Sequence, residues 1–335
     1  MSRKLSNKSE IKKILVVSLT NIGDVILTFP VIDILKKDFP SAKLSIVIGP
    51  KVESLFCENP YLDKVHIFDK HQPPLESLSW IRELRRERFD LVIDLRNTAI
   101  PFMIAPRYRT SYRVKKINGQ HMKAKHLNRL GSVYTPGTQE VEPCALFVAS
   151  REEEYVDQLI EKEIGRDGCY VIVAPGAADQ SKRWSEQKFS SVCDRLIKDH
   201  NVKIIFVGDG NDRKVAQRIN KFMEADCVNL CGRTNLVQLA ELFKHCFFTI
   251  VNDSAPMHIA SYLNIPVLAL FGPSDPSLYG PWSKQSCFLR KSETCQACAN
   301  PKSALEHTCM DAITDADVYE MLQINVPENL IEFKK

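Results

Sequence analysis

The sequence lacks any long apolar run. No stretch of its 335 residues approaches the roughly 18 apolar residues that a membrane-spanning helix needs, so a membrane-spanning protein is not expected. The basic start of the chain has no apolar segment before Ile14, which does not fit the pattern of a secretory signal. The composition is that of a folded globular protein, with 44% hydrophobic, 26% charged and 8% aromatic residues.

Two common nucleotide-binding signatures are also missing. The loop at 18–24 follows an apolar segment but does not have the G-x-G-x-x-G spacing of dinucleotide-binding folds. The loop at 174–184 contains Gly176 and Lys182 but not the G-K-[ST] of a P-loop. Dinucleotide binding and P-loop chemistry are therefore poorly supported.

Cysteine, by contrast, is plentiful. Eleven cysteines in a chain without an export pattern indicate a reducing compartment and mostly free thiols. Cys295 and Cys298 form a C-x-x-C pair with His307 and Cys309 downstream, a set that suits tetrahedral zinc. Against a metal, no second C-x-x-C follows, and His307 and Cys309 are close neighbours in the sequence. We therefore expect free or structural thiols and no metal or cofactor, with a metal site as the alternative.

Positive charge is concentrated in the first half of the chain. Residues 1–150 carry 24 Lys and Arg against 15 Asp and Glu, whereas residues 151–335 carry 21 against 26. From Arg82 to Arg129 there are 13 basic side chains and four acidic ones. A solvated helix accounts for the first part of this stretch, but the later part has aromatic and His residues interleaved. We favour a surface that binds a phosphorylated partner or a membrane, and no motif indicates nucleic acid.

The expected elements alternate between strand and helix. In the first half, strands are expected at 13–18, 44–48, 65–68 and 91–95, with one helix ending near Lys37 and another at 78–88. In the second half, strands are expected at 170–174, 203–207, 247–251 and 267–271, with helices at 151–164, 186–199, 213–223, 236–244, 257–263 and 315–322. This pattern predicts parallel sheets with helices on both faces.

The length and a polar linker predict two domains. A chain of this length holds about two domains of roughly 150 residues each. The polar, Pro-containing segment 140–143 is the expected linker. We place the domains at 1–150 and 151–312, with a helical tail at 313–335 that packs back on the first domain. The cleft between the domains is the default ligand site.

The most informative stretch runs from Asn252 to Pro276. It reads as a strand end, a polar loop, a helix beginning near Pro256 and ended by Asn264, and a second buried strand. Asp253, Ser254 and His258 would then lie at the carboxyl ends of parallel strands, where α/β sheets bind ligands and where helix N–H groups suit an anion. An ordinary strand-helix repeat is the alternative.

Three further loops follow predicted strands. Small residues and the Lys182-Arg183 pair between 174 and 184 suit a phosphate, although a surface loop with a packing Trp explains them as well. Asp212, in the loop after the next strand, could accept hydrogen bonds from ribose hydroxyls or simply belong to a turn. Asp24 stands at the start of the first helix, where a stabilising helix charge is the preferred interpretation and a general base the alternative.

Together these loops resemble glycosyltransferase family 9, the family of the bacterial heptosyltransferases. The matching stretches are ILVVSLTNIGDVILTFP, VIVAPGAADQSKRW, NDSAPMHIASYLNIPVLALFGPSDP and the tail CQAC…HTCMDAIT. They extend over almost the whole chain, and the third is the most specific. The resemblance implies an α/β, GT-B fold with two Rossmann-like, doubly wound domains facing a cleft. The first domain would bind the acceptor and the second the nucleotide sugar.

The resemblance also implies roles for individual residues. Asp24 matches the proposed catalytic base of the family, Lys182 the lysine at the donor phosphate, and Asp212, more loosely, the ribose-binding acid. The donor loop D-[ST]-G-x-x-H falls on Asp253, Ser254, Ala255 and His258. Most members have Gly at the position of Ala255, and many have a basic residue at that of Ser18.

The acceptor is expected to meet the basic region of the first domain. The residues assigned to acceptor binding are Asn21, Arg107, Arg109, Arg113 and Arg129. The implied reaction is an inverting, metal-independent transfer of heptose from ADP-heptose to lipopolysaccharide core or another phosphorylated glycolipid. The expected location is the cytoplasm, with peripheral contact to the inner membrane. Alternatives are another nucleotide sugar, a GT-B epimerase, or a non-catalytic protein that binds sugar nucleotides.

Overall fold

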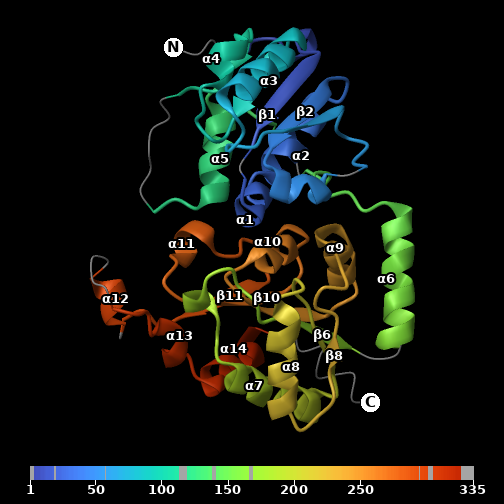
Figure 1. Ribbon diagram of the computed structural model, residues 1–335, viewed down its shortest axis with the longest axis vertical. Coiled ribbons are helices and arrows are strands. Elements are labelled where there is room, and N and C mark those ends of the chain that lie inside the picture. Colours follow the sequence, from blue (N-terminus) through green and yellow to red (C-terminus); the bar gives the residue numbers. More distant parts are fainter. Residues whose placement is uncertain are drawn as a thin grey trace. The chain divides into compact units, whose positions relative to one another are not determined.

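The chain folds into two compact units, Met1–Ala149 and Ser150–Lys335, and each contains a parallel β-sheet (Figure 1). Each unit is described separately. The computed structural model describes residues 4–18, 20–56, 58–112, 119–137, 141–165, 169–293, 295–300 and 305–325.

The first unit is built on five parallel strands in the order β3-β2-β1-β4-β5. The strands are β1 (Lys13–Val17), β2 (Lys43–Ile48), β3 (Lys64–Ile67), β4 (Leu91–Asp94) and β5 (Tyr108–Arg109). The helices are α1 (Ile22–Ile26), α2 (Phe29–Asp38), α3 (Pro74–Arg86), α4 (Ile100–Ile104) and α5 (Met122–Gly131), with short 3₁₀ turns at Lys8–Glu10 and Pro50–Leu55. The central strands β1 and β4 are continuous apolar runs because both faces of the sheet are covered.

The order of the first sheet reverses between β1 and β4. From β1 the chain proceeds outward to β2 and β3, then returns to place β4 on the other side of β1. Open α/β sheets bind ligands at the carboxyl ends of the strands where such a reversal occurs. The loops after β1 and β4 therefore form the expected ligand-binding edge of this unit.

The structure corrects one prediction in this region. The sequence pattern predicts a single helix ending near Lys37, but two helices, α1 and α2, are found with a break at Leu27 and Thr28. Pro30 lies in the first turn of α2 and has no N–H to continue the hydrogen bonding of α1. The Thr28 hydroxyl, completely buried, donates to the Val25 carbonyl at 2.6 Å and holds the break in place.

The second unit has six parallel strands in the order β11-β10-β9-β6-β7-β8. The strands are β6 (Tyr170–Ala174), β7 (Lys203–Phe206), β8 (Val228–Asn229), β9 (Phe248–Asn252), β10 (Val267–Phe271) and β11 (Ser286–Arg290). The helices are α6 (Ser150–Glu163), α7 (Glu186–His200), α8 (Asp212–Phe222), α9 (Leu236–Lys244), α10 (Ala255–Tyr262), α11 (Pro276–Tyr279), α12 (Gln296–Ala299), α13 (Cys309–Ala312) and α14 (Asp315–Asn325), with a 3₁₀ turn at Gln180–Lys182. Counted from β6, this is the strand order of a complete Rossmann fold, and it reverses between β6 and β9.

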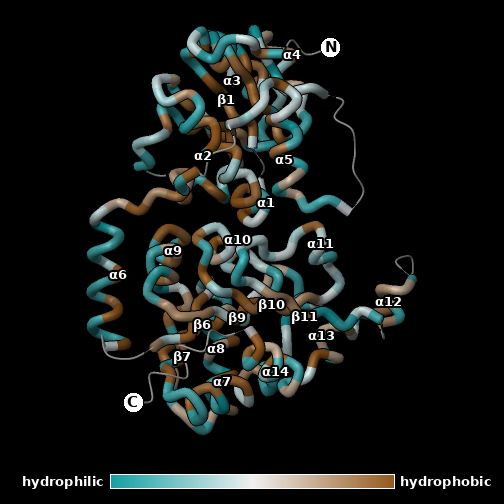
Figure 2. Tube along the Cα trace, turned by 180° about the vertical axis from the view of Figure 1, so that it is seen from behind, coloured by the Kyte–Doolittle hydropathy of each residue, from teal (hydrophilic) through white to brown (hydrophobic). Residues whose placement is uncertain are grey.

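Helices cover both faces of the second sheet. On one side α7 packs against both α8 and α14, and on the other α9 lies beside α6 and α10 (Figure 1). Helix α6 packs in this way because it is amphipathic. Figure 2 shows hydrophilic and hydrophobic colours alternating along it, and its buried residues Val156, Leu159 and Ile160 lie on one face. Asn264 follows α10 with φ at 58°, so the predicted end of that helix is confirmed.

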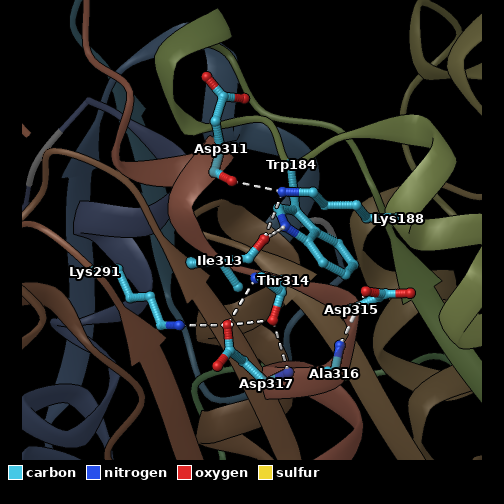
Figure 3. Close-up of polar contacts among 9 residues, drawn as sticks. All are labelled: Trp184, Lys188, Lys291, Asp311, Ile313, Thr314, Asp315, Ala316 and Asp317. Atoms are coloured by element: carbon cyan, nitrogen blue, oxygen red, sulfur yellow. Dashed lines mark hydrogen bonds and ion pairs between the residues drawn. The ribbon is translucent and has the colours of Figure 1, made fainter. Parts of the chain in front are cut away.

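The C-terminal helix α14 packs on the second unit. It contacts α7 and β11, and the segment before it is held by side chains from both sides (Figure 3). Lys291, just after β11, donates to Asp317 at 2.5 Å, and the same carboxylate oxygen accepts from the Thr314 backbone and hydroxyl. These bonds place the described part of the predicted 313–335 tail against α7 and β11. No helix among the described residues is long and apolar enough to cross a membrane.

Candidate functional site

The loops after β6 and β9 adjoin each other at the reversal of the second sheet. The two strands pair in parallel, so the segment after Ala174 and the segment after Asn252 leave the sheet at the same edge. The Asn252 side chain is completely buried, and its Nδ2 donates to the Pro175 carbonyl at 2.7 Å. This bond joins the two loops directly.

An ion pair forms the centre of this edge. The Nζ of Lys182 donates to Oδ2 of Asp253 at 2.7 Å, although 71 residues separate them in the sequence. The Asp253 side chain is 7% exposed and that of Lys182 30% exposed. Lys182 thus has one face on a buried carboxylate and another toward solvent, where it can contact an anionic ligand.

Helix α10 begins beside this ion pair. Ser254 is its N-cap with extended backbone, and Ala255 and Pro256 occupy the first turn, where a missing proline N–H costs nothing. The Ser254 hydroxyl donates back to the Asn252 carbonyl at 3.2 Å and makes no side-chain cap to the helix. In this first turn Pro256 has no N–H, and the Met257 N–H donates to the Ser254 carbonyl at 3.2 Å. The Ala255 N–H is therefore the group that can bind an anion.

His258 lies one turn further along α10. It is 5% exposed, and its ring stacks on Trp282 with the ring centroids 5.9 Å apart and the planes 27° from parallel. The side chain therefore packs beneath the start of the helix. Of the predicted donor-loop residues, Lys182, Asp253, Ser254 and Ala255 are brought together at the strand ends, with His258 behind them.

Asp212 occupies the neighbouring loop after β7. Its carboxylate accepts from the Asp209 backbone at 3.1 Å and lies against two glycines. A Cβ added to Gly176 would lie 2.2 Å from the carboxyl group, and one added to Gly208 would lie 2.5 Å from Oδ2. Burial raises the pKa of Asp212, while the Asp209 N–H and the Arg183 charge act in the opposite direction.

The buried side chain of Trp184 supports the loop that contains Lys182. The sequence analysis considered this residue only as a packing Trp. Its indole Nε1–H donates to the Ile313 carbonyl at 3.0 Å, and Lys188 donates to the carbonyls of Asp311 and Ile313 (Figure 3). The Trp184 ring is 3% exposed and packs edge-on against Phe189. The signal for this role is weak in the sequence, because a Trp after two cations reads equally well as a surface anchor.

In the first unit, Asp24 lies in the first turn of α1. Its carboxylate is half-buried and accepts from the Asn21 side-chain amide at 3.1 Å. The helix start stabilises the negative charge. The nearby Ser18, where many relatives have a basic residue, is buried and its hydroxyl is 3.0 Å from that of Thr28.

The last residue of β4 is a second carboxylate, Asp94, which sequence reasoning missed. Asp94 is 4% exposed and accepts backbone N–H groups from Arg96, Asn97 and Thr98 at 2.9, 2.9 and 2.6 Å. Burial raises its pKa, and these hydrogen bonds act against that rise. The sequence does contain an indication of this site. The polar run DLRNT at 94–98 follows an apolar strand, just as the loops selected as candidate sites do.

A cavity of about 660 Å³ opens at this edge of the first sheet. It lies among the ends of β1, β2 and β4 and the helix α3, and most of its wall is apolar. The polar and charged groups in its lining are Ser18, Gln72, Ser77, Arg96, Asn97 and Thr98. A space of this size and chemistry suits an organic ligand with a few polar groups.

The basic residues predicted for acceptor binding are dispersed. Arg129 braces the β4 loop, since its Nη1 donates to the Asp94 carbonyl at 3.3 Å and to Asn97 Oδ1 at 3.0 Å. Arg109 lies over the Phe102 ring, 4.0 Å from its centroid, and Arg107 pairs with Glu10 at 2.6 Å. Arg113 lies outside the described residues. Of the three arginines in this set that the structure describes, Arg129 is the one that reaches the loop lining the cavity.

The four residues of the cysteine motif are brought together. Cys295, Cys298, His307 and Cys309 place one potential ligand atom each within 4.8 Å of one another. The expectation of free or structural thiols rested on sequence spacing, and spacing did not reveal how closely His307 and Cys309 approach the C-x-x-C pair.

The second unit places a lysine and a helix start together at one edge of its sheet, an arrangement that suits an anionic ligand. Lys182 supplies a fixed positive charge and α10 supplies the Ala255 N–H at the end of the same strand pair. In the first unit, Asp24 is a carboxylate in the first turn of α1, in the segment that follows β1.

Comparison with known proteins agrees with this chemistry. "Lipopolysaccharide heptosyltransferase 3" of Escherichia coli K12 is 26% identical over 288 residues, 78% of this chain and 83% of the relative. A glycosyl transferase family 9 structure from Veillonella parvula matches with a TM-score of 0.77 and 23% identity over 95% of this chain and 97% of its own. The E. coli ADP-heptose lps heptosyltransferase II structure matches with a TM-score of 0.74 and 22% identity over 96% and 100%.

These matches confirm the predicted fold class, a GT-B fold of two Rossmann-like α/β domains. The family description "Glycosyltransferase family 9 (heptosyltransferase)" matches residues 134–308, which is more than half of the chain. The chain is therefore a glycosyltransferase and belongs to glycosyltransferase family 9.

Proposed function

We propose that this glycosyltransferase moves heptose from ADP-heptose to the core of lipopolysaccharide. The observation that carries the proposal is the Lys182–Asp253 ion pair beside the start of α10, at the reversal of a Rossmann-type sheet. This arrangement is suited to a nucleotide diphosphate. The sugar and the acceptor are taken from relatives named as lipopolysaccharide heptosyltransferases and, in one case, as using ADP-heptose.

Different residues of the second unit bind different parts of the nucleotide sugar. Lys182 and the backbone N–H of Ala255 stabilise the diphosphate, and Asp253 holds the lysine in position. Asp212 accepts from the ribose, and His258 supports the helix start through Trp282. Charge that develops on the departing ADP is stabilised by fixed groups, so a metal is not required for this step.

The transfer is an inverting displacement. An acceptor hydroxyl gives its proton to the Asp24 carboxylate and its oxygen attacks the anomeric carbon of the heptose. The new glycosidic bond forms as the bond between that carbon and the diphosphate oxygen breaks, and ADP leaves with the electron pair. Asn21 orients the base through its 3.1 Å hydrogen bond.

The acceptor is a phosphorylated glycolipid held by the first unit. The 660 Å³ cavity at the ends of β1 and β4 provides the binding space, and Arg129 and Arg96 provide positive charge near it. The concentration of basic residues between Arg82 and Arg129 favours an enzyme that works in the cytoplasm, in peripheral contact with the anionic inner membrane. Co-sedimentation with anionic vesicles should therefore weaken as the salt concentration rises, and salt-independent behaviour would contradict this contact.

A donor panel tests the function. The full chain is incubated with heptose-deficient core lipopolysaccharide and with ADP-heptose, ADP-glucose or UDP-glucose. ADP-glucose keeps the nucleotide and changes the sugar, whereas UDP-glucose changes both. The expected result is a heptosylated product from ADP-heptose alone, identified by mass spectrometry, with inverted anomeric configuration by NMR.

The same panel separates the alternatives. Transfer from UDP-glucose but not from ADP-heptose would show a family 9 transferase with another donor. Conversion of a donor without any acceptor would show an epimerase. Tight donor binding without turnover would show a non-catalytic sugar-nucleotide-binding protein.

A further inference from the structure

Four potential metal ligands converge near the C-terminal end of the second unit. They are the Sγ atoms of Cys295, Cys298 and Cys309 and a ring nitrogen of His307, and all lie within 4.8 Å of one another. The segments that carry them are short: α12 has four residues, α13 has four, and His307 precedes α13 on irregular chain. Convergence of four soft ligands is not explained by the donor site, because none of them is among its residues.

The separations match the edges of a tetrahedron around a metal ion. Cys298 Sγ lies 3.4 Å from His307 Nδ1 and 3.9 Å from Cys309 Sγ, and Cys295 Sγ lies 3.8 Å from the same nitrogen. With Zn–S bonds of about 2.3 Å and Zn–N bonds of about 2.0–2.1 Å, ligand atoms in a tetrahedral site lie about 3.5–3.8 Å apart. These three separations are close to the edges of a tetrahedral zinc site, and the other three pairs of ligand atoms lie within 4.8 Å of each other.

A disulfide does not account for this cluster. The sulfurs of Cys298 and Cys309 are 3.9 Å apart, and a disulfide bond is about 2.0 Å long. All three cysteines are free thiols. The backbone N–H of Thr308 points to Cys295 Sγ at 3.4 Å, which is the kind of outer hydrogen bond that stabilises a metal-bound thiolate.

The segment around these residues has little apolar core of its own. Cys295, Ala297 and Cys309 form a small buried cluster with Cys298 packed against it, separate from the main core of the unit. Helix α13 is also anchored in the main core by Met310, but α12 has only this small cluster to hold it, and small segments of this kind use a metal or disulfide instead.

The cluster is linked to the donor loop. Cys309 begins α13, and the next residue, Met310, packs on Gly272. A Cβ added to Gly272 would lie 3.1 Å from the Cγ of Met310 and 2.5 Å from the carbonyl oxygen of Ser181. One turn later the carbonyls of Asp311 and Ile313 accept from Lys188 and Trp184 (Figure 3). Whatever fixes Cys309 therefore also steadies the chain next to Lys182.

We propose that Cys295, Cys298, His307 and Cys309 bind one structural zinc ion in a closed tetrahedral site. Three thiolates and one imidazole are a ligand set that favours zinc, and with four protein ligands no position is left for a substrate. The ion holds α12 against α13 and through α13 supports the loop of Lys182. It takes no part in the transfer.

Metal content tests the site directly. The full chain is purified under reducing conditions, dialysed against a weak chelator and analysed by inductively coupled plasma mass spectrometry. We expect about one zinc per chain, and loss of at least nine-tenths of it in Cys309→Ser. The matched control is Cys287→Ser, which removes a half-buried thiol of the same unit outside the cluster and should retain the ion. Zinc-free wild-type protein that also fails to take up added zinc would overturn the proposal, as would one equivalent of iron in its place.

Two further measurements keep the test valid if Cys309→Ser does not fold. His307→Ala changes a residue on irregular chain and should weaken zinc affinity at least tenfold in a chelator competition. Wild-type protein stripped and reloaded with Co²⁺ should show the strong absorption of a tetrahedral thiolate site, and a weak octahedral spectrum would contradict it. These measurements need neither donor nor acceptor, so their outcome is independent of the proposed transfer.

Discussion

The two units place polar groups at the same point of the same kind of sheet, yet they prepare them differently. In the second unit Lys182 and Asp253 are already joined at 2.7 Å, and the loops after β6 and β9 are tied by Asn252. In the first unit Asp24 is half-buried, and its carboxylate accepts a hydrogen bond from the neutral side-chain amide of Asn21. The proposed donor unit therefore has its charges paired within the protein, whereas the proposed base of the first unit contacts only a neutral amide among the hydrogen bonds of the described residues.

This difference fits the separate tasks of the two halves. A diphosphate carries concentrated charge, and prearranged donors bind it with little reorganisation. A general base must instead remain available to a hydroxyl, and a tight cation pair would lower its affinity for the proton. Two substitutions, Asp24→Asn and Lys182→Ala, test whether the contrast is functional, and a third tests the acid stability of the first unit.

The largest effect is expected from Asp24→Asn. Loss of a general base lowers turnover by about 10²- to 10⁴-fold, or about 3–5 kcal/mol in the activation free energy. Donor affinity should stay unchanged, because the donor groups lie on the second unit. Steady-state transfer and calorimetric donor binding measure the two quantities.

Asp69→Asn is the matched control for this change. Asp69 is an exposed carboxylate in a loop of the same unit, and its amide variant should transfer at the wild-type rate. Near wild-type turnover of correctly folded Asp24→Asn would mean that the base is elsewhere.

The next effect concerns acid stability of the first unit. Burial, helped by the neighbouring charges of Arg129, His121 and Lys125, lowers the pKa of His126 to about 4, and neither ring nitrogen has a partner among the described residues. In the unfolded chain the pKa returns to about 6.5, so the unfolded state takes up the proton first. The neutral ring therefore contributes its full stability above pH 6.5, and on the order of 3 kcal/mol is lost as the pH falls to about 4.

Urea unfolding between pH 4 and 8 measures this loss. His126→Leu should flatten the dependence, while His71→Leu, which changes a His on an exposed loop, should leave it unaltered. An unchanged slope in His126→Leu would show that other groups set the acid sensitivity.

The smallest effect is expected from Lys182→Ala. A hydrogen bond to a charged group is worth about 1.5–3 kcal/mol, so donor affinity should fall about 10- to 100-fold. Lys198→Ala removes an exposed lysine from α7 of the same unit and serves as the control. Equal donor affinity in the two variants would remove the distinction between a prearranged donor half and an open acceptor half.

Much of this arrangement follows from the sequence. The strand-helix alternation predicts parallel sheets, and parallel strand ends meet at one edge, so Lys182 and Asp253 could be expected near each other. Their direct ion pair could not, because it depends on how two loops fold back over the sheet. The break between α1 and α2 was missed although Pro30 is visible, since a proline in the first turn of a new helix and one inside an old helix look alike.

Other features depend on contacts distant in the sequence. The hydrogen bond of Trp184 to Ile313 joins residues 129 positions apart, and no periodicity reports it. The cysteine cluster has the same origin, since its spacing fits no common zinc pattern and the convergence appears only once α13 is in place. Asp94, by contrast, could have been predicted from the sequence. It stands at the end of a predicted strand, as do the polar loops that were selected as candidate sites.

The contact between Gly176 and Asp212 has a consequence for redesign of the donor preference. Any side chain at position 176 would need the space that the Asp212 carboxyl group occupies, since the first added carbon would lie 2.2 Å from it. A substitution at position 176 therefore requires a change at position 212. A library that randomises Gly176 alone would displace the Asp212 carboxyl group from its place, whereas one that varies both positions together can refill that space with a new pair of side chains.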